Sequence, residues 1–347
     1  MIHKCRVCLT LAASVAAIAL SSPETSLRAS PQTVDAQPNP YQVVANHFKL
    51  PEGRTMGSTA AIDIDRDGHS VWVFERCGGA SQALACAASN AAPVLKFDAS
   101  GKLVSSFGAG MFVSPHGIHV DRQGNIWLVD GAAKDGKGNQ VIKFSPDGKV
   151  LMTLGKAGVA GDGPDTFGPP SDVLVAQNGD VFVADGHGGN TNARIVKFSK
   201  DGTFIKQWGG KGSGPGQFDT PHSLAMDSSG RLFVADRGNS RIQIFDQDGK
   251  FLQEWKQFGR PSGIFIGRND ILYSADTQSD EKTNPGFKRG IRIGSAKDGK
   301  VTALIPDADP DGTGEGIAAD ADGNIFGALT AKQALKQYVK AGKRSTE

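Results

Sequence analysis

The sequence repeats one pattern four times, and its clearest copy reads SPHGIHVDRQGNIWLVD at residues 114–130. Each copy has a Pro near its start, an alternating apolar run, a short turn and a second apolar run that ends in Asp. The turn is D-x-x-G in the clearest copies, which is typical of two antiparallel strands joined by a hairpin. The other copies are PPSDVLVAQNGDVFVAD at 169–185, TPHSLAMDSSGRLFVAD at 220–236 and RPSGIFIGRNDILYSAD at 260–276. Repetition on this scale predicts a fold assembled from copies of one structural unit.

Two more strands are predicted after the first copy, joined by a turn in QVIKFSPDGKVLMTLG at 140–155, and equivalent segments follow later copies. Four strands per unit, recurring about every 40–55 residues, are typical of the blades of a β-propeller. The segment YQVVANHFKLP from Tyr41 is expected to supply the strand that closes the ring. An all-β, six-bladed propeller is therefore predicted, with blades that start near Ala60, Pro115, Pro170, Pro221, Pro261 and Gly314.

The composition and the N-terminal residues indicate an exported protein. The chain has 347 residues, of which 21% are charged, and a net charge of +2 without a basic stripe, so no nucleic-acid partner is expected. Lys4 and Arg6 precede an apolar run at 7–20 that ends beside small residues, as in a secretory signal peptide. A monomer in the periplasm or outside the cell, free of the membrane after signal removal, is expected. The predicted division is a signal peptide at 1–21, a flexible leader at 22–40, the propeller at 41–340 and a polar tail at 341–347.

Two cysteines remain once the predicted signal peptide, with Cys5 and Cys8, is set aside. Cys77 and Cys86 lie nine residues apart in a Gly/Ala-rich insertion. In an oxidising compartment such a pair forms a local disulfide. Metal binding is the alternative, but no second Cys or His cluster accompanies them.

A candidate metal site follows from the register of the repeat. Loops that enter the innermost strands of a propeller converge at one end of the channel, so equivalent positions lie on one ring. The position after the first Pro of a blade is His116 in the second blade, His222 in the fourth and, in the last, Glu315. Two imidazoles and a carboxylate that leave positions open are what a catalytic zinc ion requires. The alternative for each residue alone is an ordinary polar side chain near the channel.

Three further residues are expected at the same rim. Arg76 and Arg237 follow the second strands of their blades, where a guanidinium suits a carboxylate substrate. An ion pair with a structural Asp is the alternative for Arg237. His187 follows the second strand of the third blade, in the Gly-rich loop DGHGGNTNAR, and is either a general base or acid or a surface histidine.

The repeated Asp has a structural interpretation. It ends the second strand of four blades, which is too regular for catalysis. We expect its carboxylate to accept backbone N–H bonds in the turn that follows. The four residues are Asp130, Asp185, Asp236 and Asp276.

Several of these motifs resemble a known family. PHGIHVDRQGNIWLVD, FGPPSDVLVAQNGDVFVADG, GPGQFDTPHSLAMD and FVADRGNSRIQIF are similar to the catalytic NHL-repeat propeller of peptidyl-α-hydroxyglycine α-amidating lyases. The likeness covers the chain from Ala60 to Trp255 well and the last two blades poorly. The resemblance implies a zinc ion held by three histidines, two active-site arginines, a tyrosine base and a structural calcium ion.

Carried over residue by residue, the resemblance gives His116 and His222 as zinc ligands and Arg76 and Arg237 as the arginines. The position of the third histidine falls at Glu315, so the ligand set becomes His, His and Glu.

Two further positions depart from the family. The position of the tyrosine falls in the loop that carries His187, which is the nearest substitute. Gly316 stands where the family has an Asp that binds calcium, so this chain lacks that calcium ligand.

The resemblance implies cleavage of a carbinolamide C–N bond to an amide and glyoxylate, on a peptide-derived substrate or a related small carboxylate. Two other functions stay open. One is a lactonase-type metal hydrolase, suggested by fold alone. The other is a non-catalytic propeller that binds a protein or glycan on its rim.

Overall fold

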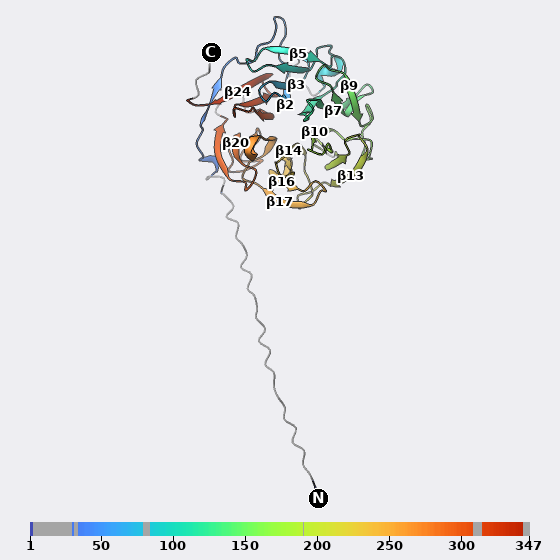
Figure 1. The fold of residues 1–347 in the computed structure, drawn as a ribbon, viewed down its shortest axis with the longest axis vertical. Coiled ribbons are helices and arrows are strands. Elements are labelled where there is room, and N and C mark those ends of the chain that lie inside the picture. Colours follow the sequence, from blue (N-terminus) through green and yellow to red (C-terminus); the bar gives the residue numbers. More distant parts are fainter. Residues whose placement is uncertain (3–29, 31–33, 79–83, 190, 308–313, 343–347) are drawn as a thin grey trace.

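The computed structural model describes residues 1–2, 30, 34–78, 84–189, 191–307 and 314–342. Within these ranges the chain forms six four-stranded antiparallel sheets, which stand around a central channel like the blades of a propeller (Figure 1). This confirms the predicted fold class. The predicted signal peptide and polar tail lie almost entirely outside the described residues, whereas residues 30 and 34–40 of the predicted leader lie within them.

The first three blades run in sequence order from the innermost to the outermost strand. The first consists of β2 (Thr59–Ile64), β3 (Val71–Glu75), β4 (Val94–Phe97) and β5 (Leu103–Phe107); the second of β6 (Pro115–Val120), β7 (Ile126–Lys134), β8 (Lys137–Phe144) and β9 (Val150–Leu154); and the third of β10 (Pro170–Val175), β11 (Val181–Asp185), β12 (Arg194–Phe198) and β13 (Phe204–Gly209).

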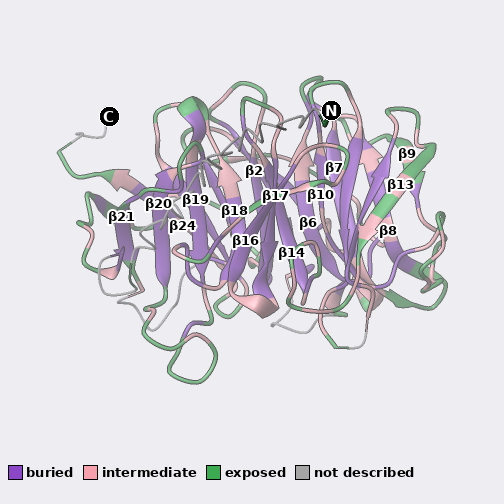
Figure 2. Ribbon diagram, turned by 90° about the horizontal axis from the view of Figure 1, so that it is seen from below, coloured by how far each residue is buried: buried purple, intermediate pink, exposed green. Residues whose placement is uncertain are grey.

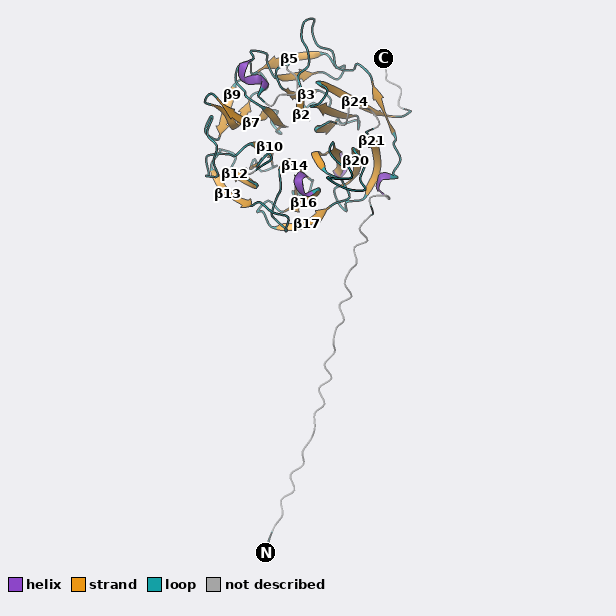
Figure 3. Cartoon of the chain, turned by 180° about the vertical axis from the view of Figure 1, so that it is seen from behind, coloured by secondary structure: helices purple, strands orange, loops and turns teal. Residues whose placement is uncertain are grey.

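The last three blades complete the ring, and the final one takes its outermost strand from the N-terminal part of the chain. They consist of β14 (Pro221–Met226), β15 (Leu232–Asp236), β16 (Arg241–Phe245) and β17 (Phe251–Trp255); of β18 (Pro261–Ile266), β19 (Ile271–Asp276), β20 (Gly290–Ser295) and β21 (Val301–Pro306); and of β22 (Gly316–Ala319), β23 (Ile325–Leu329), β24 (Ala334–Lys340) and β1 (Tyr41–Val44). In the described part of the chain, helical structure is confined to short segments, among them the 3-10 turns η1 (Ala85–Ala88), η2 (Arg237–Asn239) and η3 (Arg268–Asp270) (Figure 3).

The core lies between the blades. The inner strands are buried on both faces, whereas exposed residues gather on the outermost strands and in the loops (Figure 2). One cluster, for example, joins Trp72 and Phe74 of the first blade to Leu128 and Phe144 of the second. Each blade is thus stabilised by the apolar surface that it buries against its neighbours.

The ring closes through residues far apart in the sequence. β1 pairs antiparallel with β24, so that Tyr41 lies opposite Lys340 and Val44 opposite Gln337. Tyr41 is buried and packs in one cluster with Tyr273 and Tyr338. The pairing therefore ties the N-terminal segment to the last blade.

The carboxylates that end the second strands are structural, but their backbone partners differ from the prediction. Asp130 accepts hydrogen bonds from the backbone N–H groups of Val113 and Ser114, which precede β6 rather than follow β7. At Asp276 the donors come from both sides, from Arg260 before β18 and from Ser279 after β19. The expectation that the following turn supplies the donors is therefore wrong at Asp130. The acid instead holds the segment that enters the innermost strand of its own blade.

Cys77 and Cys86 form the predicted disulfide, with 5.2 Å between their Cα atoms. Both cysteines are buried beside the apolar cluster of the first and second blades. No helix among the described residues has the length and apolar character needed to span a membrane.

Candidate metal centre

The ring of equivalent positions lies at one end of the channel, where a cavity of about 490 Å³ is lined by the inner strands. His116 and His222 are the second residues of β6 and β14, and Glu315 directly precedes β22. All three are among the residues that line this cavity. The repeat register thus brings together side chains from the second, fourth and sixth blades.

His116 and His222 are oriented by the same contact. Nδ1 of His116 lies 2.6 Å from the carbonyl oxygen of Ser171, and Nδ1 of His222 lies 2.7 Å from that of Ser262. In each case the acceptor belongs to the residue at the same register in the next blade. Because a carbonyl oxygen only accepts, each Nδ1 carries the proton, and each Nε2 keeps a free lone pair. Both Nε2 atoms are buried and have no hydrogen-bond partner among the described residues.

Glu315 faces these lone pairs. Its Oε1 lies 3.1 Å from Nε2 of His222 and 3.3 Å from Nη1 of Arg237. A carboxylate oxygen and an unprotonated imidazole nitrogen are both electron-rich, so their close approach requires a cation or a proton between them. This juxtaposition is the strongest local sign of a metal ion.

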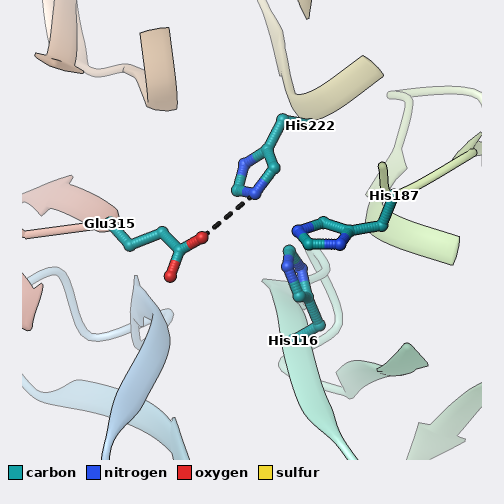
Figure 4. Close-up of side chains that lie close together, drawn as sticks. All are labelled: His116, His187, His222 and Glu315. Carbon is teal, nitrogen blue, oxygen red and sulfur yellow. Dashed lines mark ion pairs between the residues drawn. The ribbon is translucent and has the colours of Figure 1, made fainter. Parts of the chain in front are cut away.

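His187 joins the same cluster from the loop after β11. Its ring centroid lies 4.5 Å from that of His116 and 5.1 Å from that of His222. One ligand atom from each of the four side chains lies within 4.8 Å of the others, and all four converge on one region (Figure 4). From the sequence, His187 is predicted to be a general base or acid or a surface histidine, apart from the ligands. The surface alternative is wrong, because the residue is half-buried and its ring lies beside the other imidazoles.

A signal for this placement was present in the sequence. His187 follows Asp185 and Gly186, at the blade edge where Arg76 and Arg237 also lie. Gly186 has a φ of +139°, and a Cβ there would come within 1.5 Å of the carbonyl oxygen of Asn192. Only glycine therefore fits at the position that turns the chain toward the channel.

The two arginines lie beside the cluster, but only one of them is paired with a carboxylate among the described residues. Arg237 contacts Glu315 and also lies 3.4 Å from Nε2 of His187. The alternative that it pairs with a structural Asp is therefore wrong. Arg76 is buried, and its guanidinium contacts only neutral oxygens, the hydroxyl of Ser58 at 3.3 Å and the carbonyl of Pro115 at 3.4 Å. No carboxylate among the described residues lies within ion-pair distance of Arg76.

Burial sets the protonation of the histidines. It lowers the pKa of His116 and of His222, with the positive charge of Arg237 adding to the effect at His222. Burial, with His222 and Arg237 nearby, lowers the pKa of His187 to about 3. The three rings are therefore neutral at neutral pH and offer lone pairs.

Glu315 stays ionised in the same surroundings. Burial favours its neutral form, but the contact with His222 and the positive charge of Arg237 hold its pKa well below the usual range. Three neutral imidazoles and one carboxylate suit a divalent first-row ion such as zinc. The orphaned Nε2 atoms and the facing carboxylate fit such an ion.

Comparison with known proteins places the chain among NHL propellers. Residues 218–245 match the NHL repeat family. Over 243 residues the chain is 36% identical to peptidyl-glycine alpha-amidating monooxygenase B of Xenopus laevis, a match that covers 65% of this chain and 26% of the frog protein. Over 142 residues it is 37% identical to a Caenorhabditis elegans protein described as a probable peptidyl-alpha-hydroxyglycine alpha-amidating lyase, covering 40% of this chain and 38% of the other. The matched segments thus span well under two thirds of both relatives.

Among solved structures, a gluconolactonase from Xanthomonas campestris superposes with a TM-score of 0.60 at 16% identity. This match covers 90% of the present chain and 93% of the other. At that identity the likeness concerns the fold alone.

Proposed function

We propose that this NHL-repeat propeller, which is related to the amidating lyases, is a metal-dependent lyase that cleaves the C–N bond of an N-acyl-α-hydroxyglycine or a related carboxylate. The cluster of His116, His187, His222 and Glu315 carries the proposal, because its ligand atoms converge within 4.8 Å beside two arginines. The sequence likeness to amidating enzymes supports the reaction class.

His116, His222 and Glu315 would hold the ion, which we propose to be zinc. Such an ion supplies a Lewis acid for the hydroxyl or carboxylate oxygen of the substrate. Arg76, which has no carboxylate partner among the described residues, is suited to the carboxylate of the substrate through charge-assisted hydrogen bonds.

The remaining step is a proton transfer. In the proposed reaction the hydroxyl gives up its proton, its oxygen forms the aldehyde of glyoxylate, and the electron pair of the breaking C–N bond goes to nitrogen. The nitrogen takes up a proton and leaves as the amide. His187 is the proposed base, because its imidazole is neutral and faces the cluster.

Two other functions have less support. A lactonase-type hydrolase rests on structural likeness at 16% identity, which concerns the fold alone. A rim-binding propeller without catalysis leaves the buried, mutually facing donors without a role.

We further propose export of the chain as a monomer. The Cys77–Cys86 disulfide is consistent with an oxidising compartment.

Metal analysis tests the proposal. Mature protein is purified, supplied with zinc, freed of excess and analysed for metal, beside His222→Asn and the control His47→Asn, which replaces a histidine outside the channel lining. Asparagine at 222 retains a side-chain N–H for the carbonyl of Ser262 but removes the ligand nitrogen. We expect about one zinc per chain in the wild type and control, loss in His222→Asn, and glyoxylate release from an N-acyl-α-hydroxyglycine by the loaded protein. A wild type that holds no metal would overturn the proposal.

A further inference from the structure

We infer that His187 is an exchangeable fourth donor, which completes the coordination of the ion until a substrate oxygen displaces it. This inference rests on the proposed function and extends it, because the side chain proposed as the base would first be a ligand.

The ring of His187 lies as close to the rings of His116 and His222 as those two rings lie to each other. The ring centroids of His116 and His222 are 4.9 Å apart, and that of His187 lies 4.5 Å and 5.1 Å from them. The three imidazoles thus form a nearly equilateral arrangement, and Glu315 approaches it from the side of His222 (Figure 4). By these distances His187 is as well placed to bind the ion as His116 and His222.

The anchoring of the three histidines does differ. Nδ1 of His116 and Nδ1 of His222 each donate to a backbone carbonyl of the neighbouring blade, and both residues lie on innermost strands. His187 lies on a loop, where Gly188 and Gly189 follow with positive φ and open space around them. Among the described residues, the side chain of His187 has one hydrogen-bonding contact, between its Nε2 and Arg237 at 3.4 Å. Its Nδ1 has no hydrogen-bond acceptor among these residues. Its ring is therefore the one of the three that can turn away from the centre at least cost.

Coordination chemistry gives this difference a consequence. Four protein donors fill a tetrahedral ion, as in structural zinc sites, whereas catalytic sites keep one position open for water or substrate. An ion bound by His116, His187, His222 and Glu315 together has no such position. A substrate oxygen that enters must displace the donor that is held least firmly, which is His187. Once displaced, its Nε2 lies next to the entering hydroxyl and can take the proton.

Arg237 supports the exchange. Its guanidinium contacts Oε1 of Glu315 and lies beside Nε2 of His187, so it touches both donors at once. Arg237 holds the carboxylate of Glu315 in place through an ion pair, but its contact with the neutral imidazole of His187 is long and therefore weak. Glu315 therefore remains on the ion when His187 leaves.

Cobalt-substituted protein tests this inference without turnover. Four-coordinate Co²⁺ absorbs visible light much more intensely than Co²⁺ with five or six ligands. We expect the intense spectrum for the wild type and for the control His47→Ala. The variant His187→Ala, saturated with Co²⁺ and checked for folding by circular dichroism, should show absorption bands at shifted wavelengths, because a water oxygen replaces an imidazole nitrogen at the vacated position.

Glycolate serves as the probe, since it carries the hydroxyl and carboxylate of the substrate but no C–N bond. In the wild type it must displace His187, so its apparent affinity is reduced by the fraction of protein in which that position is open. If that fraction is about one tenth or less, His187→Ala binds glycolate at least about 10-fold more tightly.

The possible failures are distinguishable. A Co²⁺-loaded wild type whose spectrum and glycolate affinity do not change in His187→Ala overturns this inference and leaves the proposed lyase intact. A wild type that binds no Co²⁺ overturns both.

Discussion

His116 and His222 show how one contact can prepare a residue for metal binding. Each ring is held by the carbonyl of the next blade, which fixes both its orientation and its tautomer. A hydrogen bond from the ring nitrogen that does not bind the metal orients a metal-bound histidine and raises its affinity for the ion. The backbone of the propeller thus supplies what a separate carboxylate supplies in many other metal sites.

The buried histidines predict how the metal-free protein responds to acid. Their pKa values are lowered by burial, so below about pH 6.5 the unfolded chain binds more protons than the native state. The free energy of unfolding should therefore fall as the pH drops below about 6.5, by up to about 1.4 kcal/mol per pH unit for each histidine. Urea unfolding of chelator-treated protein between pH 7 and pH 5 measures this, and His222→Asn should show a shallower slope. Equal slopes for the two proteins would contradict the prediction.

The two arginines predict different phenotypes. Arg76 has no carboxylate partner among the described residues, whereas Arg237 pairs with Glu315. A hydrogen bond to a charged group contributes about 1.5–3 kcal/mol, so Arg76→Met should raise KM for a carboxylate substrate by roughly 10- to 100-fold while zinc content stays constant. Arg237→Met should instead weaken zinc binding, because Glu315 loses its partner. Steady-state kinetics together with metal analysis separate the two, and equal effects of both variants on zinc would count against this assignment.

At the scale of the element, the acids at the ends of second strands hold the segments that enter the innermost strands of the blades in which they occur. Asp236 accepts hydrogen bonds from the backbone N–H of Asp219 and from the side chains of Asn239, Arg241 and Gln243. The Glu that ends β3, Glu75, has the same place in the first blade and binds Arg54 at 2.6 Å. The rim that carries the proposed metal ligands is therefore anchored by a set of buried carboxylates.

Removal of one of these carboxylates should destabilise the protein strongly. Asp236→Ala leaves the buried guanidinium of Arg241 without its inner partner, and breaking a buried ion pair in this way costs about 3–5 kcal/mol. Asp248→Ala is the matched control, because Asp248 has an exposed side chain whose ion pair with Lys197 is worth at most about 1 kcal/mol. Denaturant unfolding compares the two variants. A loss at Asp236 no greater than that at Asp248 would show that the carboxylate is not a structural anchor.

At the scale of the whole molecule, the ring depends on the pairing of β1 with β24. Six blades that bury apolar surface only against their neighbours gain from closure, because an open ring would leave two blade faces in water. The N-terminal strand connects the first blade to the last through residues at both ends of the propeller. Closure also brings the blades that carry the proposed metal ligands around one channel.

Tyr41 should therefore contribute more to the free energy of unfolding than its position on a short strand suggests. Tyr41→Ala removes a buried ring from the cluster with Tyr273 and Tyr338, a loss of about 3–5 kcal/mol for large aromatic side chains. Gln42→Ala, on the same strand and exposed, should be nearly neutral. Thermal unfolding of both variants is the measurement. A Tyr41→Ala protein as stable as the Gln42→Ala protein would contradict a stabilising role for the closure.

The repeat can be recognised from the amino-acid sequence alone, and much of the architecture follows from it. Alternation of apolar residues and the spacing of the turns indicate four strands per unit and six units, which the sheets confirm. Equivalent positions of a propeller must lie on one ring, so the sequence also placed His116, His222 and Glu315 at one end of the channel. These inferences hold because strand register depends on local patterns, and every blade repeats the same pattern.

The contacts that the repeat does not specify depend on how the blades are arranged around the channel. His187 lies on a loop with an insertion, where no register applies, and its approach to the other imidazoles depends on the turn at Gly186. Arg237 pairs with Glu315 rather than with an Asp of its own blade, because the partner stands two blades away across the channel. The carbonyls that orient His116 and His222 likewise belong to neighbouring blades. Such contacts arise from the closing of the ring, which brings together residues that no local pattern relates.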